Sequence, residues 1–183
     1  SSERYQEVKV KIDNESKFQH VTLIQSSPGL ARARNASFSK ISGDIVHFMD
    51  DDIILPPNYF EVVDKAFFDN PQTGGLSPFI ESTSTFKDVL IKKFKSPIFQ
   101  GYGKLSKSGR ANWLSSSGKN YLVDWLPGCC MVYRINSIQS FRFETGLENG
   151  PLGGYALGED LDFSHRVSKY TQLLGLGEIS VFH

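Results

Sequence analysis

Short apolar runs alternate with amphipathic stretches along this chain. The run 45–49 is rich in β-branched and aromatic residues, which is typical of a buried strand. Further strands are predicted at 18–25, 76–80, 121–125, 129–134 and 178–183. Helices are predicted at 30–41, 58–68 and 159–170. Because strands and helices alternate, the pattern indicates an α/β sandwich built on a mixed sheet.

Two segments interrupt this pattern. Residues 95–119 are rich in Ser, Gly and Lys, and residues 144–158 contain five glycines. Irregular segments of this length in compact domains usually carry function or move. The sequence therefore predicts a long loop at each place.

The composition is that of one soluble globular domain. The chain has 183 residues, 39% of them hydrophobic and 22% charged, which is enough for a sizeable core. Its formal net charge is zero, so bulk charge gives no reason to expect a nucleic-acid partner. No apolar stretch reaches the roughly 20 residues of a membrane span. The adjacent Cys129 and Cys130 are predicted to be reduced core residues, as in a cytoplasmic protein.

Three consecutive carboxylates, Asp50, Asp51 and Asp52, follow directly on the buried run 45–49. A buried strand cannot carry three carboxylates into a core, so they are expected at its C-terminal end. Ligands of open α/β sheets bind at that edge. Carboxylates gathered there favour a hard divalent cation, Mg²⁺ or Mn²⁺, that bridges to a phosphate-bearing ligand. An acidic turn before the next helix is the plainer alternative.

A second acidic group, Glu159, Asp160 and Asp162, opens the helix predicted at 159–170. Acidic residues at a helix start also complement the helix dipole, without any catalytic role. Asp160 is spaced i, i+3, i+7 with two apolar residues, so it is expected to face the core and to serve as a general base. Glu159 is the second candidate for that role. Asp162 is expected to pair with Arg166 at i, i+4.

Two further side chains fit a site at this edge. Arg34 falls on the apolar face of the helix 30–41, where a guanidinium needs a partner: a ligand phosphate, an aspartate or backbone carbonyl groups. His183 ends the last predicted strand, and a neutral imidazole there would complete an oxygen-rich metal site. A terminal histidine without any role is the usual alternative.

Four motifs follow one another along the chain: Gly29-Leu-Ala-Arg-Ala-Arg-Asn35, Gly43-Asp-Ile-Val-His-Phe-Met-Asp-Asp-Asp52, Asp124-Trp-Leu-Pro-Gly128 and Gly158-Glu-Asp-Leu-Asp162. Together and in this order they resemble the motifs of inverting, family 2-like glycosyltransferases of the GT-A fold. The resemblance covers roughly residues 20 to 183. It implies a GT-A-like, Rossmann-like three-layer sandwich with a mixed, mostly parallel sheet.

The resemblance also implies roles for single residues. Asp52 would bind the metal on the donor diphosphate, and His183 would be a further ligand. Asp50 would reach the ribose or the metal, with Asp51 and Arg34 also on the nucleotide-sugar side. Asp160 would be the base, with Glu159 beside it. Trp125 and Gly128 would line the acceptor side, although a core role explains Trp125 nearly as well.

The chain departs from the family at its N-terminus. No strand with nucleotide-base contacts opens it, so the resemblance indicates a single catalytic domain over 1–183 that lacks its first βαβ portion. Such a fragment would expose a sheet edge, which invites association with a second copy. The expected location is the cytoplasm, or the cytoplasmic face of a membrane.

The predicted activity is glycosyl transfer, with inversion, from a nucleoside-diphosphate sugar to a carbohydrate or lipid-linked acceptor, as in polysaccharide biosynthesis. Two alternatives stand beside it. One is another metal-dependent nucleotide-sugar enzyme, such as a nucleotidyltransferase, although the basic Gly-rich signature expected near its N-terminus is missing. The other is a truncated or non-catalytic module that keeps the fold without binding a nucleotide.

Overall fold

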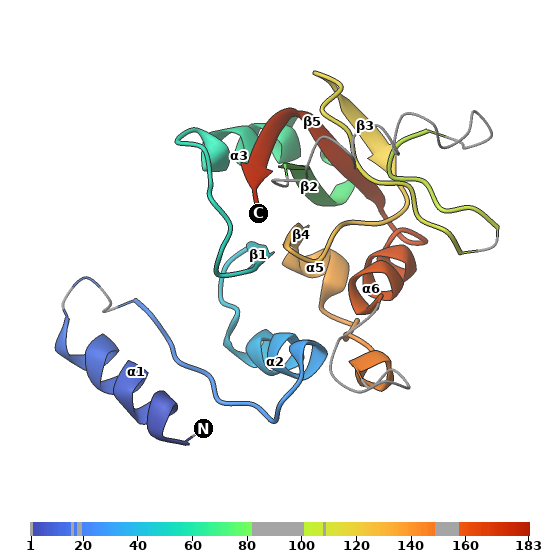
Figure 1. Ribbon diagram of the computed structural model, residues 1–183. Helices are drawn as coiled ribbons and strands as arrows, with labels where there is room; N and C mark the ends of the chain where they lie inside the picture. The colour runs from blue at the N-terminus through green and yellow to red at the C-terminus, as the bar shows by residue number, and fades with distance from the viewer. Residues whose placement is uncertain (1, 16, 18–19, 82–100, 108, 149–157) are drawn as a thin grey trace, which may run out of the picture.

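The computed structural model describes residues 2–15, 17, 20–81, 101–107, 109–148 and 158–183 (Figure 1). Its α-helices are α1 Ser2–Asn14, α2 Leu30–Ser37, α3 Tyr59–Asp69, α5 Ile135–Ile138 and α6 Glu159–Val167. Short 3₁₀ helices cover η2 Phe38–Lys40 and η3 Thr145–Glu148. The strands are β1 Ile45–Met49, β2 Thr73–Glu81, β3 Asn120–Val123, β4 Cys130–Arg134 and β5 Gln172–Phe182.

The five described strands form one mixed sheet in the order β1-β4-β2-β5-β3. β4 runs antiparallel to β1 and to β2, β5 runs parallel to β2, and β3 runs antiparallel to β5. The predicted mixed sheet is therefore confirmed, but the expectation that it is mostly parallel is wrong for these pairings. The crossover through α3 does make β1 and β2 run the same way. β4, however, lies between them and runs in the opposite direction.

Helices cover both faces of the sheet, which confirms the three layers (Figure 1). Side chains alternate along β4, as they must in a strand. Met131 and Tyr133 join the core beneath α2 and α6. Val132, from the other face of β4, joins the core beneath α3. Each face of the sheet therefore has its own apolar cluster.

The strand predicted at 18–25 does not form in the residues of this segment that the structure describes. Within 18–25, residues 18–19 lie outside the described residues, and residues 21–25 have no regular structure. Val21 is 48% exposed, because no neighbouring strand of the described chain pairs with this segment. The preceding helix α1 was not predicted. It lies away from the sheet in Figure 1.

The other predicted elements lie close to their predicted positions, except that β5 begins at Gln172, six residues before the strand predicted at 178–183. Residues 101–107 and 109–119 are irregular apart from one bridge between Leu105 and Ala111, as the loop prediction required. The remainder of that loop, and residues 149–157 of the glycine-bearing loop, lie outside the described residues. Both cysteines are free thiols. Among the described helices, none has both the length and the apolarity to cross a membrane.

Phe163 attaches α6 to the core. Its ring is fully buried and stacks on Phe143 at a centroid distance of 3.9 Å. It also meets Tyr133 edge-on at 5.6 Å. Because α6 begins with Glu159 and Asp160, this aromatic contact fixes the position of the acidic group.

We predict that Phe163→Ala lowers the free energy of unfolding by about 3–5 kcal/mol, since it leaves a cavity where a large ring was fully packed. Chemical denaturation measures the change. Phe68→Ala is the matched control, because that ring is 85% exposed, and its expected effect is within about 0.5 kcal/mol. Equal losses in the two variants would contradict the packing assigned to α6.

Candidate functional site

Asp50 and Asp52 lie where two strand ends meet. The Asp50 N–H donates to the Cys129 carbonyl at 3.0 Å, immediately after β1 pairs with β4. The chain then forms a bridge from Ile54 to Phe182, the last residue of β5. The next residue, His183, donates its N–H to the Glu81 carbonyl at the end of β2 at 3.0 Å. Backbone pairing thus brings the aspartates and the histidine to one edge of the sheet, as predicted.

Their side chains form a group that fits a metal ion. His183 Nε2 lies 3.3 Å from Asp52 Oδ1 and 3.8 Å from Asp50 Oδ2. One ligand atom from each of the three residues lies within 4.8 Å of the others. Ligands at about 2.1 Å around one ion are themselves separated by roughly 3–4 Å, so only small adjustments would be needed. Asp51 is exposed and is not part of this group.

Arg34 connects this edge to α6. Its side chain is only 8% exposed, and it stands over the Phe143 ring at 5.3 Å. Nη1 donates to Glu159 Oε1 at 3.1 Å, and Nη2 donates to the Gly128 carbonyl at 2.8 Å. Asp50 Oδ1 lies 3.8 Å from the same Nη2. The predicted inward Arg34 is therefore satisfied by protein groups, chiefly by Glu159 and a backbone carbonyl.

The orientation predicted for the acidic residues of α6 was partly wrong. Glu159 is the buried member, 4% exposed, whereas Asp160 is half-buried. Around the helix Glu159 lies about 40° to one side of Phe163 and Asp160 about 60° to the other, so spacing alone does not decide which of the two is buried. Their partners do: Glu159 accepts from the buried Arg34, whereas Asp160 accepts the Gly128 N–H. The predicted pair of Asp162 and Arg166 does form, at 2.7 Å.

Asp160 faces the turn 124–128. Its Oδ2 accepts the Gly128 N–H at 2.7 Å, and its Oδ1 accepts the Leu161 N–H at 2.8 Å. A Cβ atom on Gly128 would lie 2.9 Å from Asp160 Oδ2, so a side chain there would displace the carboxylate. Glycine at position 128 thus lets one residue hold Asp160 through its N–H and Arg34 through its carbonyl oxygen.

Trp125 is a core residue in this structure. It is 4% exposed, and its indole N–H donates to the Asn112 carbonyl at 3.0 Å. The exposed indole is that of Trp113, 64% exposed, whose ring lies 5.6 Å from Trp125. An acceptor contact by Trp125 itself stays a prediction. No local sequence signal singled out Trp113.

Cys129 adjoins both acidic groups. Burial, with the nearby Asp50 carboxylate as a further cause, raises the pKa of the Cys129 thiol to about 12. At neutral pH this residue is therefore a protonated thiol, not a thiolate nucleophile. The reactive groups of the site are its carboxylates and its imidazole.

The chain matches glycosyl transferase family 2 over residues 2–136, which is most of its length. It belongs to this family. The matched segment contains Arg34, Asp50 and Asp52, and it ends before α6 and His183. No curated protein matches the chain in sequence.

Two solved structures resemble the chain in fold. GalNAc-T7 with UDP, GalNAc and Mn²⁺ aligns with a TM-score of 0.64 and 16% identity, over 97% of this chain and 35% of that chain. Residues 1–349 of S. aureus TarS align with a TM-score of 0.53 and 15% identity, over 87% of this chain and 41% of that chain. This confirms the GT-A-like fold. The chain spans less than half the length of either protein.

We predict that Arg34→Met destabilises the protein by about 3–5 kcal/mol, because it leaves the Glu159 carboxylate buried without its partner. The double variant Arg34→Met/Glu159→Leu should recover most of that loss, since it removes both charges. Urea denaturation of the two single variants and the double variant measures the coupling. A double variant as unstable as Arg34→Met would show that the ion pair is not the cause.

Proposed function

We propose that this chain transfers a glycosyl group from a nucleoside-diphosphate sugar to an acceptor hydroxyl, with inversion at the transferred carbon. The observation that carries the proposal is the meeting of Asp50, Asp52 and His183 at one sheet edge, with Asp160 held nearby. Both groups are close to Cys129, because the Asp50 and Asp160 carboxylates each contribute, after burial, to the raised pKa of its thiol. A metal-binding group beside a fixed carboxylate suits this reaction.

The donor side is formed by the sheet edge. Asp50, Asp52 and His183 would hold a divalent ion, and their carboxylate oxygens and imidazole nitrogen suit Mn²⁺ or Mg²⁺. Such an ion neutralises negative charge on a departing diphosphate. Arg34, close to Asp50, adds a fixed positive charge at the same edge. The GalNAc-T7 structure contains UDP, GalNAc and Mn²⁺, so a uridine nucleotide with Mn²⁺ is the first combination to test.

Asp160 is the proposed base. Each of its oxygens accepts one backbone N–H, which fixes the carboxylate and leaves lone pairs for the proton of an acceptor hydroxyl. The acceptor oxygen then attacks the sugar carbon from the face opposite the diphosphate. The bond from that carbon to the diphosphate oxygen breaks with its electron pair. Glu159 is less suited to this role, because Arg34 already occupies one of its oxygens.

In the proposed site the metal ion joins the carboxylates to the donor diphosphate, so a nucleotide is expected to bind only when the metal is present. We predict that UDP, GDP, CDP or dTDP raises the melting temperature only in the presence of Mn²⁺, because a ligand of the folded state stabilises it. At about one hundred times Kd, the gain is about 2.7 kcal/mol. Asp52→Asn should abolish the shift. Asp64→Asn on α3, which is exposed and is not part of the metal-binding group, is the control.

If no nucleotide stabilises the protein with the metal, donor binding by this chain is refuted. The chain would then be a non-catalytic module that keeps the glycosyltransferase fold. If Mn²⁺ without a nucleotide raised the melting temperature of Asp52→Asn as much as that of Asp64→Asn, the metal would bind at another site.

The base assignment is tested separately. We predict that Asp160→Asn lowers turnover of the bound nucleotide sugar by about 10²–10⁴-fold, the usual contribution of a general base. Nucleotide and Mn²⁺ binding should stay as in the native protein, because Asn can still accept the Gly128 N–H. Turnover is measured as release of the nucleoside diphosphate. Unchanged turnover in Asp160→Asn would exclude this residue as the base.

A further inference from the structure

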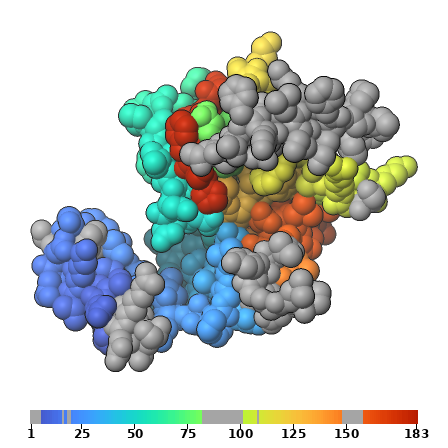
Figure 2. Space-filling model, viewed as in Figure 1, coloured from blue at the N-terminus to red at the C-terminus, as the bar shows by residue number. Residues whose placement is uncertain are grey.

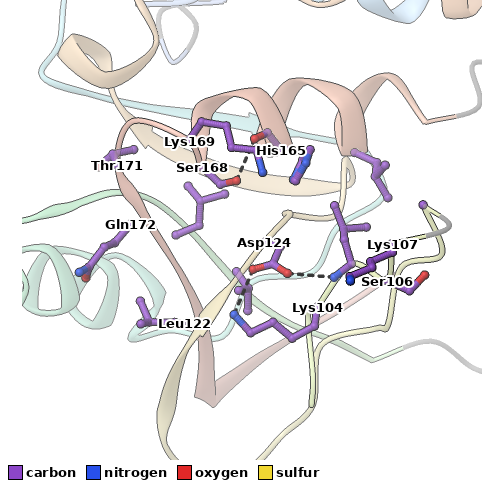
Figure 3. A pocket seen from close by; sticks show the side chains of 15 residues that line it. Lys104, Ser106, Lys107, Leu122, Asp124, His165, Ser168, Lys169, Thr171 and Gln172 are labelled. Carbon is purple, nitrogen blue, oxygen red and sulfur yellow. Dashed lines mark hydrogen bonds and ion pairs between the residues drawn. The ribbon is translucent and has the colours of Figure 1, made fainter. Parts of the chain in front are cut away.

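A cavity of about 650 Å³ lies beside the turn 124–128. Its walls come from residues 104–107 and 109, from β3, from α6 with the turn that follows it, and from the start of β5 (Figure 3). Asp124 projects into the middle of the view, between Lys104 and the side chains of α6. None of the residues proposed for metal binding or base catalysis lines it.

The cavity gathers positive charge, although the chain as a whole is formally neutral. Lys104, Lys107 and Lys169 line it, and Asp124 is its one acidic lining residue among the described residues. Lys107 and Lys169 are exposed, and neither makes an ion pair within the part of the chain that the structure describes. The pocket therefore carries more positive than negative charge.

The charge of Asp124 is already compensated. Its Oδ1 accepts a hydrogen bond from Lys104 Nζ at 3.0 Å, and its Oδ2 accepts the Leu105 N–H at 3.0 Å. Burial by itself would raise the pKa of Asp124, but the bonds from Leu105 and Lys104 outweigh it and lower the pKa. Asp124 is thus ionised at neutral pH and fully engaged. It holds Lys104 in place and leaves Lys107 and Lys169 for a ligand.

His165 places an imidazole beside the cavity. Its Nδ1 is buried and has no hydrogen-bond partner among the described residues. Buried polar atoms in folded proteins are normally paired, and an unpaired one is costly. The Ser168 hydroxyl beside it donates to the His165 backbone carbonyl, so it does not satisfy the ring. Because this nitrogen is buried from solvent, it offers no contact to a ligand in the cavity, and His165 counts here only as a lining residue.

The cavity adjoins the proposed acceptor side. Leu161 lines it, and the N–H of the same residue holds Asp160 Oδ1. His165 lies four residues beyond Leu161, about 6 Å farther along the helix axis at 1.5 Å per residue. Asp160 contacts Gly128 at one end of the turn 124–128, and Asp124 at the other end lines the cavity, so an acceptor that follows this turn from Asp160 would place a neighbouring unit at the cavity.

We propose that this cavity binds an oxyanion, a phosphate or carboxylate group, carried by the acceptor. The proposal rests on the glycosyl transfer proposed above, because it assigns the chemistry of the acceptor for the same site. Lysine ammonium groups suit such an anion as compact charges with several donors. The mixed lining of Lys, His and Ser side chains is complementary to a charged, hydroxylated chain.

The test is titration of the full chain with inorganic phosphate at low salt, followed through the backbone amide signals in NMR spectra. We expect saturable shifts at Leu105, Leu161 and His165. Lys107→Ala/Lys169→Ala should weaken phosphate binding by about tenfold, since charge-assisted hydrogen bonds are lost. Both side chains are exposed, so the fold should persist. Lys9→Ala/Lys11→Ala on α1 removes the same charge elsewhere and should change nothing.

Three sugars then identify the anion. Glucose 6-phosphate and glucuronate separate a phosphate source from a carboxylate source, and glucose is the neutral control. Glucose bound as tightly as the two anions would overturn the proposal. So would equal weakening by the two double variants, or phosphate shifts scattered over the whole surface. The titration needs no nucleotide and no metal, so its failure and a failure of donor binding are told apart.

Discussion

The arrangement of the site depends on one buried guanidinium. Arg34 reaches Glu159 and Gly128, which lie 125 and 94 positions away in the chain. A buried charge is tolerated only when it is paired and hydrogen-bonded, so the positions of α2, the turn 124–128 and the start of α6 are linked. Since Gly128 also holds Asp160 through its N–H, the position of the proposed base depends on the same arginine.

The metal-binding group depends on an irregularity of the sheet. Pro78 of β2 is opposite Leu176 of β5, but the next residue, Phe79, is opposite Ser180. Proline has no N–H to donate to a ladder, which explains why regular pairing stops there. The offset puts three residues of β5, 177–179, outside the register, and from Ser180 the pairing continues with Val181 and Phe182 opposite Ile80 and Glu81. His183 consequently lies next to the end of β2 and beside Asp52.

The parts of this structure that the sequence could predict are those set by local pattern. The apolar run before Asp50 fixed β1 and placed the carboxylates at its end, and the acidic start of α6 was visible in the same way. The relative direction of neighbouring strands could not be predicted from local sequence, because β4 lies between β1 and β2 in the sheet but comes from a later part of the chain. The segment 18–25 had a strand pattern, yet a strand needs a partner, and none of the described strands supplies one.

The same limit applies to side chains. Arg34 was expected inward because of its helical position, but its partners lie on other elements and could not be inferred from spacing. For α6, two spacings were compatible with the apolar residues, and packing against Phe143 selects the one that buries Glu159. The buried state of Trp125 depends likewise on a carbonyl group in a loop, that of Asn112.

Helix α6 serves both proposed sites because each residue turns about 100° from the last. Glu159 and Phe163 face the core, Asp160 faces Gly128, and His165 faces the basic cavity. Asp162 and Arg166 pair on the remaining, more exposed side, where such a pair adds only about 0.3–0.5 kcal/mol. In the proposed reaction, a ligand that displaced His165 as part of the whole helix would displace Asp160 as well, because both residues belong to α6.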